Sequence, residues 1–171
     1  MNSFETIYDF ASNDGFKRFK ILLAPIGIFL LARFFLFLIE NDKNEDLFKN
    51  PEQQKFKIYL IQYISVLIFM LFLIMFGSKY YNTYNLYNNS LFETEGFVTN
   101  FHAMPSGGHD SERFTVNGVK FQFSDFDISN FGYNNVKSNG GAINANKYVR
   151  ISYIKVNNSN QILKLEVRKQ N

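Results

Sequence analysis

The stretch Ile58–Gly77, IYLIQYISVLIFMLFLIMFG, decides the fold of this 171-residue chain. It carries no charge, and Gln62 is its one side-chain amide. A helix rises about 1.5 Å per residue, so this stretch is long enough for the roughly 30 Å hydrocarbon core of a bilayer. Cations and tyrosines, which favour the membrane–water boundary, flank it: Lys55, Lys57, Lys79, Tyr80 and Tyr81. We therefore predict a transmembrane helix over residues 58–78.

A second apolar stretch, residues 21–39 (ILLAPIGIFLLARFFLFLI), predicts another transmembrane helix. Pro25 lies in its first turns, where a missing hydrogen bond costs least. Arg33 lies near its centre, and a cation there costs about 2.5–3.5 kcal/mol on insertion scales. Two interpretations stay open: Arg33 snorkels to the nearer interface, or it faces a pore or a neighbouring helix. In either case Gln62 is a natural hydrogen-bond partner.

The segment between the two spans, residues 40–57, is short and polar and contains Asn50-Pro51, which predicts an antiparallel helical hairpin. Lysines and arginines are balanced four against four on its two sides, so charge does not fix the topology. We expect no cleavable signal peptide, because an acidic tail precedes the first cations and no small-residue site follows the apolar run. This favours a multi-pass membrane protein with a cytoplasmic soluble domain.

Residues 1–20 are polar with spaced aromatics, and they are expected to form either a tethered tail or an amphipathic helix on the membrane surface. Residues 79–90 are rich in Asn and Tyr and are expected to be a linker.

Residues 91–170 alternate apolar and polar side chains in a pattern typical of a small β domain. Asn117-Gly118 is the preferred type I′ hairpin turn and separates two of the strands. Strands are expected over residues 91–103, 114–116, 119–123, 147–156 and 161–169, with a sixth if the first breaks at Gly96. Closing so small a sheet buries its apolar face and removes its edges. The predicted fold class is thus an α+β membrane protein with an OB-like antiparallel β-barrel of five or six strands. We expect these core residues: Val98, Phe101, Val116, Phe121, Val149, Ile151, Leu165 and Val167.

Composition excludes several functions. The chain has no cysteine, so it has no disulfide, thiolate zinc site or cysteine nucleophile. Its net charge of +3 is too dispersed to predict binding to duplex nucleic acid. His102, His109, Asp110 and Glu112 match no standard zinc spacing, and acid–base chemistry by a histidine with Asp125 or Asp127 stays an open alternative. Nucleophile and nucleotide-binding glycine motifs are absent, so we expect neither an enzyme nor a cofactor.

A more suggestive set combines aromatic, amide and cationic side chains in and beside the Gly/Asn-rich segment 124–145. Aromatic rings stack on bases, amides bind base edges, and cations and glycines accommodate phosphates. The candidate ligand residues are Tyr133, Asn134, Asn135, Lys137, Arg150, Tyr153 and His102, with Phe131, Gly140 and Gly141 nearby. The alternative interpretation is a loop that closes the barrel, with Arg150 a solvated strand cation.

The order of these parts resembles the two-transmembrane β-barrel effectors of bacterial anti-phage signalling, found in CBASS and related cyclic-oligonucleotide systems. The resemblance implies a cytosolic barrel that binds a cyclic nucleotide and controls self-association of the helices, which then disrupt the inner membrane. Its implied partners are a cyclic oligonucleotide, the lipid bilayer and further copies of the chain. Two other interpretations are a membrane-anchored OB-like scaffold without a small ligand and, least favoured, a membrane enzyme.

Overall fold

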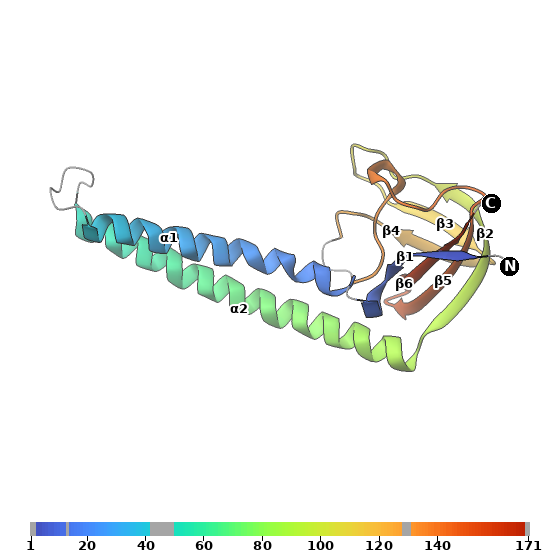
Figure 1. Cartoon of the computed structure of the whole chain (residues 1–171), viewed down its shortest axis with the longest axis horizontal. Coiled ribbons are helices and arrows are strands. Elements are labelled where there is room, and N and C mark those ends of the chain that lie inside the picture. Colours follow the sequence, from blue (N-terminus) through green and yellow to red (C-terminus); the bar gives the residue numbers. More distant parts are fainter. Residues whose placement is uncertain (1–2, 13, 42–49, 128–130, 170–171) are drawn as a thin grey trace. The chain divides into compact units, whose positions relative to one another are not determined.

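The computed structural model describes residues 3–12, 14–41, 50–127 and 131–169 (Figure 1). They belong to two compact units. The helical unit is Phe19–Ser78, and the sheet unit comprises Met1–Arg18 and Lys79–Asn171.

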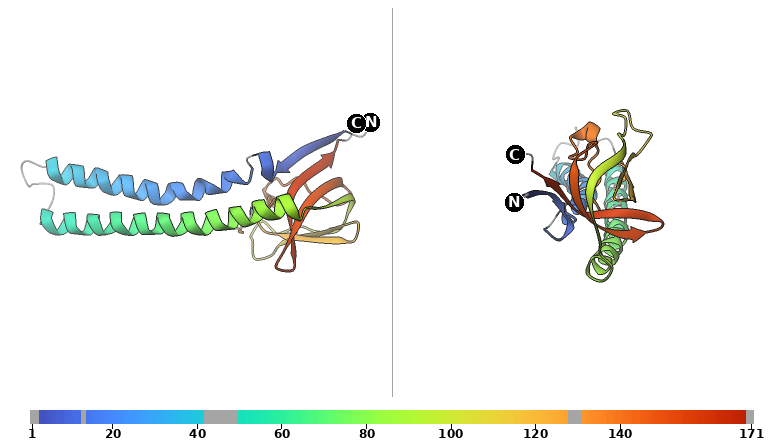
Figure 2. Two further views of the ribbon diagram at one scale, coloured as in Figure 1. Left: turned by 90° about the horizontal axis from the view of Figure 1, so that it is seen from below. Right: turned by 90° about the vertical axis from the view of Figure 1, so that its right-hand side faces the viewer.

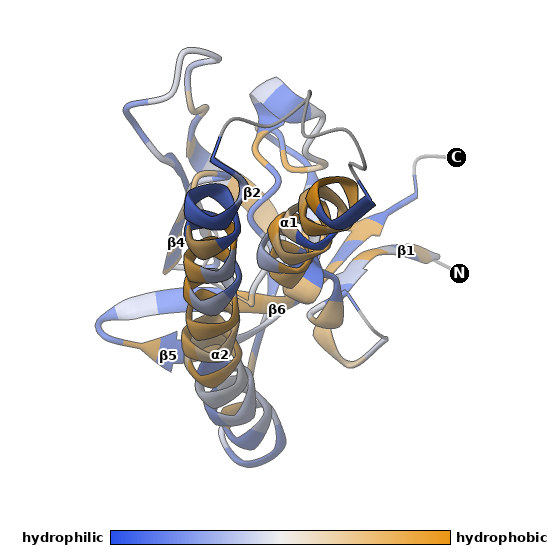
Figure 3. Ribbon diagram, turned by 90° about the vertical axis from the view of Figure 1, so that its left-hand side faces the viewer, coloured by the Kyte–Doolittle hydropathy of each residue, from blue (hydrophilic) through white to orange (hydrophobic). Residues whose placement is uncertain are grey.

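Two long helices dominate the helical unit. A 3-10 segment, η2 (Phe16–Leu22), leads into α1 (Leu23–Asn41), and α2 runs from Pro51 to Asn89. Both helices are long and apolar enough to cross a membrane. Their apolar side chains are largely exposed, as at Phe37 (58%) and Ile74 (65%), and most of their turns are hydrophobic (Figure 3). A helix that is apolar all round and not covered by protein fits association with lipid.

The two helices pack side by side in opposite directions (Figures 1 and 2), so the predicted antiparallel hairpin is confirmed. Ala32, Leu36 and Ile39 of α1 and Phe76 of α2 are buried. Of the predicted connector, residues 51–57 already belong to α2, whereas residues 42–49 lie outside the described residues.

The expected linker over residues 79–90 is wrong, because α2 continues to Asn89. Packing in the sheet unit stabilises these last turns. The Phe10 ring centroid lies 5.3 Å from that of Tyr80 and 5.8 Å from that of Tyr87, and Thr83 is 7% exposed. Tertiary contacts therefore outweigh the modest helix propensity of Asn and Tyr.

The sheet unit is built on a six-stranded antiparallel sheet in the order β1-β6-β5-β2-β3-β4. Its strands are β1 (Phe4–Asp9), β2 (Phe92–His102), β3 (Glu112–Val116), β4 (Val119–Phe123), β5 (Tyr148–Val156) and β6 (Ser159–Arg168). Short 3-10 turns lie at Phe10–Ser12 (η1) and Lys137–Asn139 (η3).

The prediction of a tail or surface helix over residues 1–20 is wrong, because residues 4–9 form β1. This strand pairs with β6 in the register Phe4↔Arg168 and Thr6↔Glu166. It supplies the sixth strand, whereas β2 runs unbroken through Gly96.

The sheet does not close into a barrel, which corrects the expected OB-like closure. Strand β6 pairs on one side with β5 and on the other with β1, so neither of its edges is free for β4. The sheet curls instead (Figure 2), and the Asn160 side-chain amide donates a hydrogen bond of 2.8 Å to the Lys120 carbonyl.

Turn chemistry and core agree with the sequence pattern. Asn117 and Gly118 have φ values of 46° and 81°, and Asn157 and Asn158 have 45° and 63°, as type I′ turns require. Seven of the eight expected core residues lie in the buried cluster, and Phe101 is partly buried against it.

Candidate functional site

Two of the predicted ligand residues belong to the core. Tyr133 and Tyr153 are 5% and 6% exposed. The Tyr133 hydroxyl accepts a hydrogen bond of 2.9 Å from the Ala142 amide, and burial raises its pKa. The Tyr153 ring stacks on Phe92. Both rings fill the interior of the sheet unit.

The Asn/Gly-rich residues hold their own segment in place. The Asn134 side-chain oxygen accepts a hydrogen bond from the Arg18 guanidinium, and its amide donates one of 3.2 Å to the Asp127 carbonyl. The Lys137 backbone amide donates a bond of 2.8 Å to Glu112, whereas Asn135 is exposed.

Arg150 and His102 occupy charged surface networks. Arg150 lies 2.6 Å from Glu95 and 3.7 Å from Glu166, and it covers the Phe4 ring. His102 Nε2 lies 2.7 Å from an Asp110 carboxylate oxygen, and this hydrogen bond lowers the pKa of Asp110. Across the described part of the chain, no three His, Asp or Glu side chains gather as a metal site would require.

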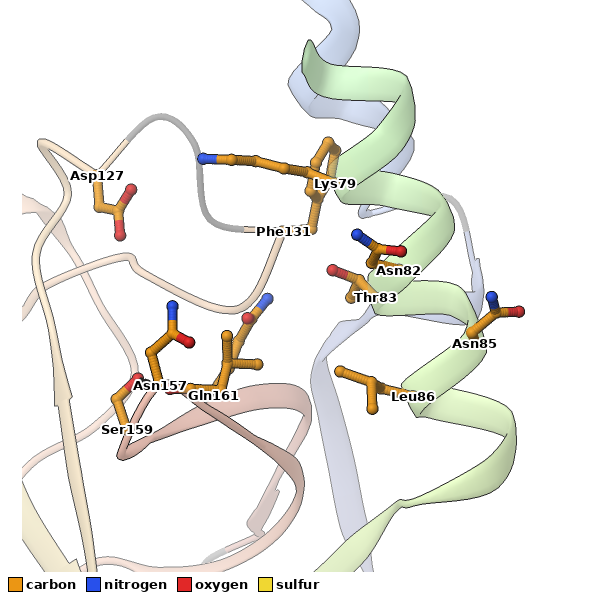
Figure 4. A pocket seen from close by; sticks show the side chains of 11 residues that line it. Lys79, Asn82, Thr83, Asn85, Leu86, Asp127, Phe131, Asn157, Ser159 and Gln161 are labelled. Carbon is orange, nitrogen blue, oxygen red and sulfur yellow. Dashed lines mark hydrogen bonds between the residues drawn. The ribbon is translucent and has the colours of Figure 1, made fainter. Parts of the chain in front are cut away.

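A cavity of the sheet unit lies apart from these residues. It has a volume of about 740 Å³ and lies between the last turns of α2 and the β5–β6 hairpin (Figure 4). We call it the α2 pocket; its lining residues are Lys79, Asn82, Thr83, Asn85, Leu86, Asp127, Phe131, Val156, Asn157, Ser159 and Gln161. None of the seven predicted ligand residues lines it.

Figure 4 shows how these side chains are arranged. Asn82, Thr83 and Leu86 point from α2 toward the hairpin that carries Asn157 and Gln161. Asn85 points away from it. Asn157 of the β5–β6 turn and Gln161 of β6 thus face the same space as Asn82 and Thr83 of α2.

The chemistry of the α2 pocket is that of a polar recognition site. Its lining includes amides, hydroxyls, one ammonium group (Lys79) and one carboxylate (Asp127). The Gln161 amide nitrogen is buried and has no hydrogen-bond partner among the described residues. Such an atom calls for a water or a ligand to satisfy it, and the volume is typical of small-molecule sites. The pocket can therefore bind a small hydrogen-bonding molecule, with an anionic group opposite Lys79.

Sequence reasoning missed this site because it treated the α2 residues as linker. The available signal was the set of four asparagines among residues 80–89, which make this stretch too polar for a lipid-facing helix.

The two candidate membrane residues do not bond each other. Arg33 is exposed on α1, and within the described residues its guanidinium makes no hydrogen bond or ion pair. The Gln62 amide nitrogen is buried and likewise lacks a partner in that part of the chain. The helical unit alone thus leaves a cation and an amide donor unsatisfied.

Comparison with known proteins adds nothing to this geometry: no protein-family model, curated protein or solved structure matches the chain.

Proposed function

We propose that this protein is a two-helix membrane effector of bacterial anti-phage defence. Its sheet unit binds a small signal of the cyclic-nucleotide class, and its helices self-associate in the inner membrane and disrupt it. The sheet unit is cytoplasmic in this proposal, and the protein has no catalytic activity of its own.

Membrane insertion is supported by the exposed apolar surface of both helices. In water, exposed side chains such as Phe34, Leu71 and Ile74 would form an aggregation-prone apolar surface, whereas lipid solvates them.

The observation that carries the proposal is the extent of α2. This helix contains the predicted span 58–78 and continues to Asn89, and five residues of this continuation line the α2 pocket: Lys79, Asn82, Thr83, Asn85 and Leu86. A ligand in that cavity contacts the same continuous helix that would cross the bilayer. Differential binding of a ligand to two arrangements of α2 shifts the equilibrium between them.

Self-association is supported by the unsatisfied polar groups of the helical unit. A cation and an amide donor within apolar helices are costly, and neighbouring helices are where such groups find partners. Arg33 is exposed and can reach such a helix, whereas the Gln62 amide nitrogen is buried within the helical unit.

Expression of the full chain in bacteria with a membrane-potential dye tests this proposal. The probes are cyclic di-GMP and cyclic di-AMP. The membrane potential should collapse under one of two conditions, either when a nucleotide is present or when it is absent. Lys79→Gln should weaken the nucleotide response, whereas Lys120→Gln, at an exposed position of β4, should preserve it. Unchanged potential and growth in both states would refute an effector.

A membrane-anchored scaffold is the second candidate, and the open sheet favours it. Among the described residues, β1 and β4 each pair with a strand on one side, so each offers an edge to which a protein partner can add a strand. This function would be favoured if the membrane potential stayed intact and the chain captured a protein partner. Gln122→Pro in β4 should then abolish the capture.

A further inference from the structure

A second cavity of the sheet unit lies at the other ends of β5 and β6. The register sets Phe97 opposite Tyr148 and Phe4 opposite Arg168. Their neighbours in the strands, Val98, Val149 and Val167, are buried in the core, so this row lies on the outer face of the sheet.

Aromatic rings hold Arg168 in this row. Its guanidinium carbon lies 3.4 Å from the Tyr148 ring centroid and 6.0 Å from that of Phe4. The Tyr148 ring in turn meets Phe97 edge-on, with 4.9 Å between centroids. The Arg168 Nε atom is buried, and no described residue accepts a hydrogen bond from it. The stack therefore orients a guanidinium without satisfying it.

In the next row of the same face, the cations form ion pairs with carboxylates. There Arg150 pairs with Glu95 and Glu166, and Lys164 pairs with Glu166 at 3.0 Å. In this row the carboxylates of Glu95 and Glu166 therefore neutralise the cations of Arg150 and Lys164.

Around the second cavity the cations outnumber the acids. The cavity has a volume of about 400 Å³, and three cations and one carboxylate are among its lining residues: Lys147, Arg168, Lys169 and Glu5. Within the described residues, no carboxylate forms an ion pair with any of the three cations. Phe97 is 57% exposed beside them.

We infer that this cavity, the Arg168 pocket, is a binding site for a phosphate ester. The guanidinium fork matches phosphate oxygens bidentately, and the lysines add compact positive charge. The exposed Phe97 ring offers a surface for the organic group that the phosphate carries. The inference does not depend on the proposed function, because the α2 pocket lies at the opposite ends of β5 and β6. The same chemistry suits a soluble nucleotide or a lipid headgroup.

Titration calorimetry on the full chain in a neutral detergent tests the site. The soluble probe is AMP with adenosine as its phosphate-free control. The lipid probe is dihexanoyl phosphatidic acid with dihexanoyl phosphatidylcholine as its control. At least one phosphate monoester should bind, and its control should bind at least about tenfold more weakly. Binding of AMP assigns the site to nucleotides, and binding of phosphatidic acid assigns it to lipid headgroups.

Variants locate the binding. Arg168→Gln should weaken it about tenfold, as loss of a charge-assisted hydrogen bond predicts. Lys147→Gln, which leaves the ring stack intact, should weaken it in the same direction and guards against a folding defect. Lys120→Gln should bind like the wild type.

Absence of binding by both monoesters up to 10 mM would overturn the inference. It would also be overturned if Lys79→Gln removed the binding while Arg168→Gln and Lys147→Gln preserved it. In that case the ligand occupies the α2 pocket, and the proposed function survives without the second site.

Discussion

The Tyr8 hydroxyl donates a hydrogen bond of 2.5 Å to the carbonyl of Phe131, which lies 123 residues further along the chain. This bond joins β1 to the segment that lines the α2 pocket. The Tyr8 side chain is partly buried, and burial raises its pKa well above its ordinary value. The hydroxyl is therefore a donor at every physiological pH.

Tyr8→Phe should destabilise the sheet unit by about 1–2 kcal/mol, because it removes a partly buried hydrogen bond without changing the ring. Thermal unfolding of the full chain in detergent, followed by near-UV circular dichroism, measures the change. Tyr81→Phe is the matched control, since Tyr81 is 63% exposed. Equal stability of both variants would mean that β1 is not anchored through Tyr8.

Gly141→Ala should cost more than 2 kcal/mol of folding free energy, because an added Cβ would overlap the Asn135 carbonyl oxygen and lie 2.7 Å from the Val136 carbonyl carbon. Gly107→Ala has nothing within 4 Å and should change the unfolding midpoint little. Chemical denaturation of the two variants makes the comparison. Similar midpoints would show that the segment after Asn135 does not fold against itself as described.

Glu112 should make the sheet unit less stable as the pH rises. Its side chain is fully buried, and burial raises the pKa above the ordinary value of 4.5, although the Lys137 amide donates to it. A raised pKa in the folded state means that its stabilising contribution is present below pH 4.5 and is lost as pH rises through the folded-state value.

Glu112→Gln should remove this pH dependence, at about 1.4 kcal/mol for each unit by which the pKa is raised. Unfolding midpoints between pH 4 and pH 8 should move in favour of the variant as the pH increases. Glu5→Gln, at an exposed position, is the control. Parallel curves for Glu112→Gln and the wild type would contradict the prediction.

The sequence predicts most of the fold because its strongest patterns are local. The two apolar stretches, the Asn117-Gly118 turn and the alternation in β5 and β6 need no tertiary information. Strand β1 was missed because it is an edge strand whose partner, β6, lies at the other end of the chain. Barrel closure was wrongly expected for the same reason, since β1 takes the edge of β6 that closure would use.

The candidate site was harder to predict than the fold. Side-chain type suggested that Tyr133 and Tyr153 would stack on a ligand, but both aromatic rings are buried in the core. Asn82 and Asn157 are far apart in sequence, and only the packing of α2 against the sheet within this unit makes them line one cavity. Tertiary contacts of this kind leave no local pattern.

Arg33→Leu should abolish membrane disruption while leaving the protein in the membrane fraction, because it removes the cation proposed to contact a neighbouring helix. Arg33→Lys keeps the charge and should retain part of the activity. Growth on induction reports membrane disruption, and in-membrane crosslinking reports contact between helices of neighbouring copies. Full toxicity and wild-type crosslinking of Arg33→Leu would instead assign Arg33 to snorkelling.

In the proposed function α2 links the α2 pocket to the membrane, and Ser78, exposed where the predicted span ends, is the place to break that link. A proline in a helix interior removes a backbone hydrogen bond and kinks the helix at a cost of about 3 kcal/mol. Ser78→Ala is the matched control.

Dye release from liposomes containing the full chain, titrated with cyclic di-GMP and cyclic di-AMP, measures the link directly. Release should respond to at least one of the two nucleotides in the wild type and in Ser78→Ala, and it should no longer respond in Ser78→Pro. An equal response in Ser78→Pro, or no release from the wild type with or without nucleotide, would contradict the claim.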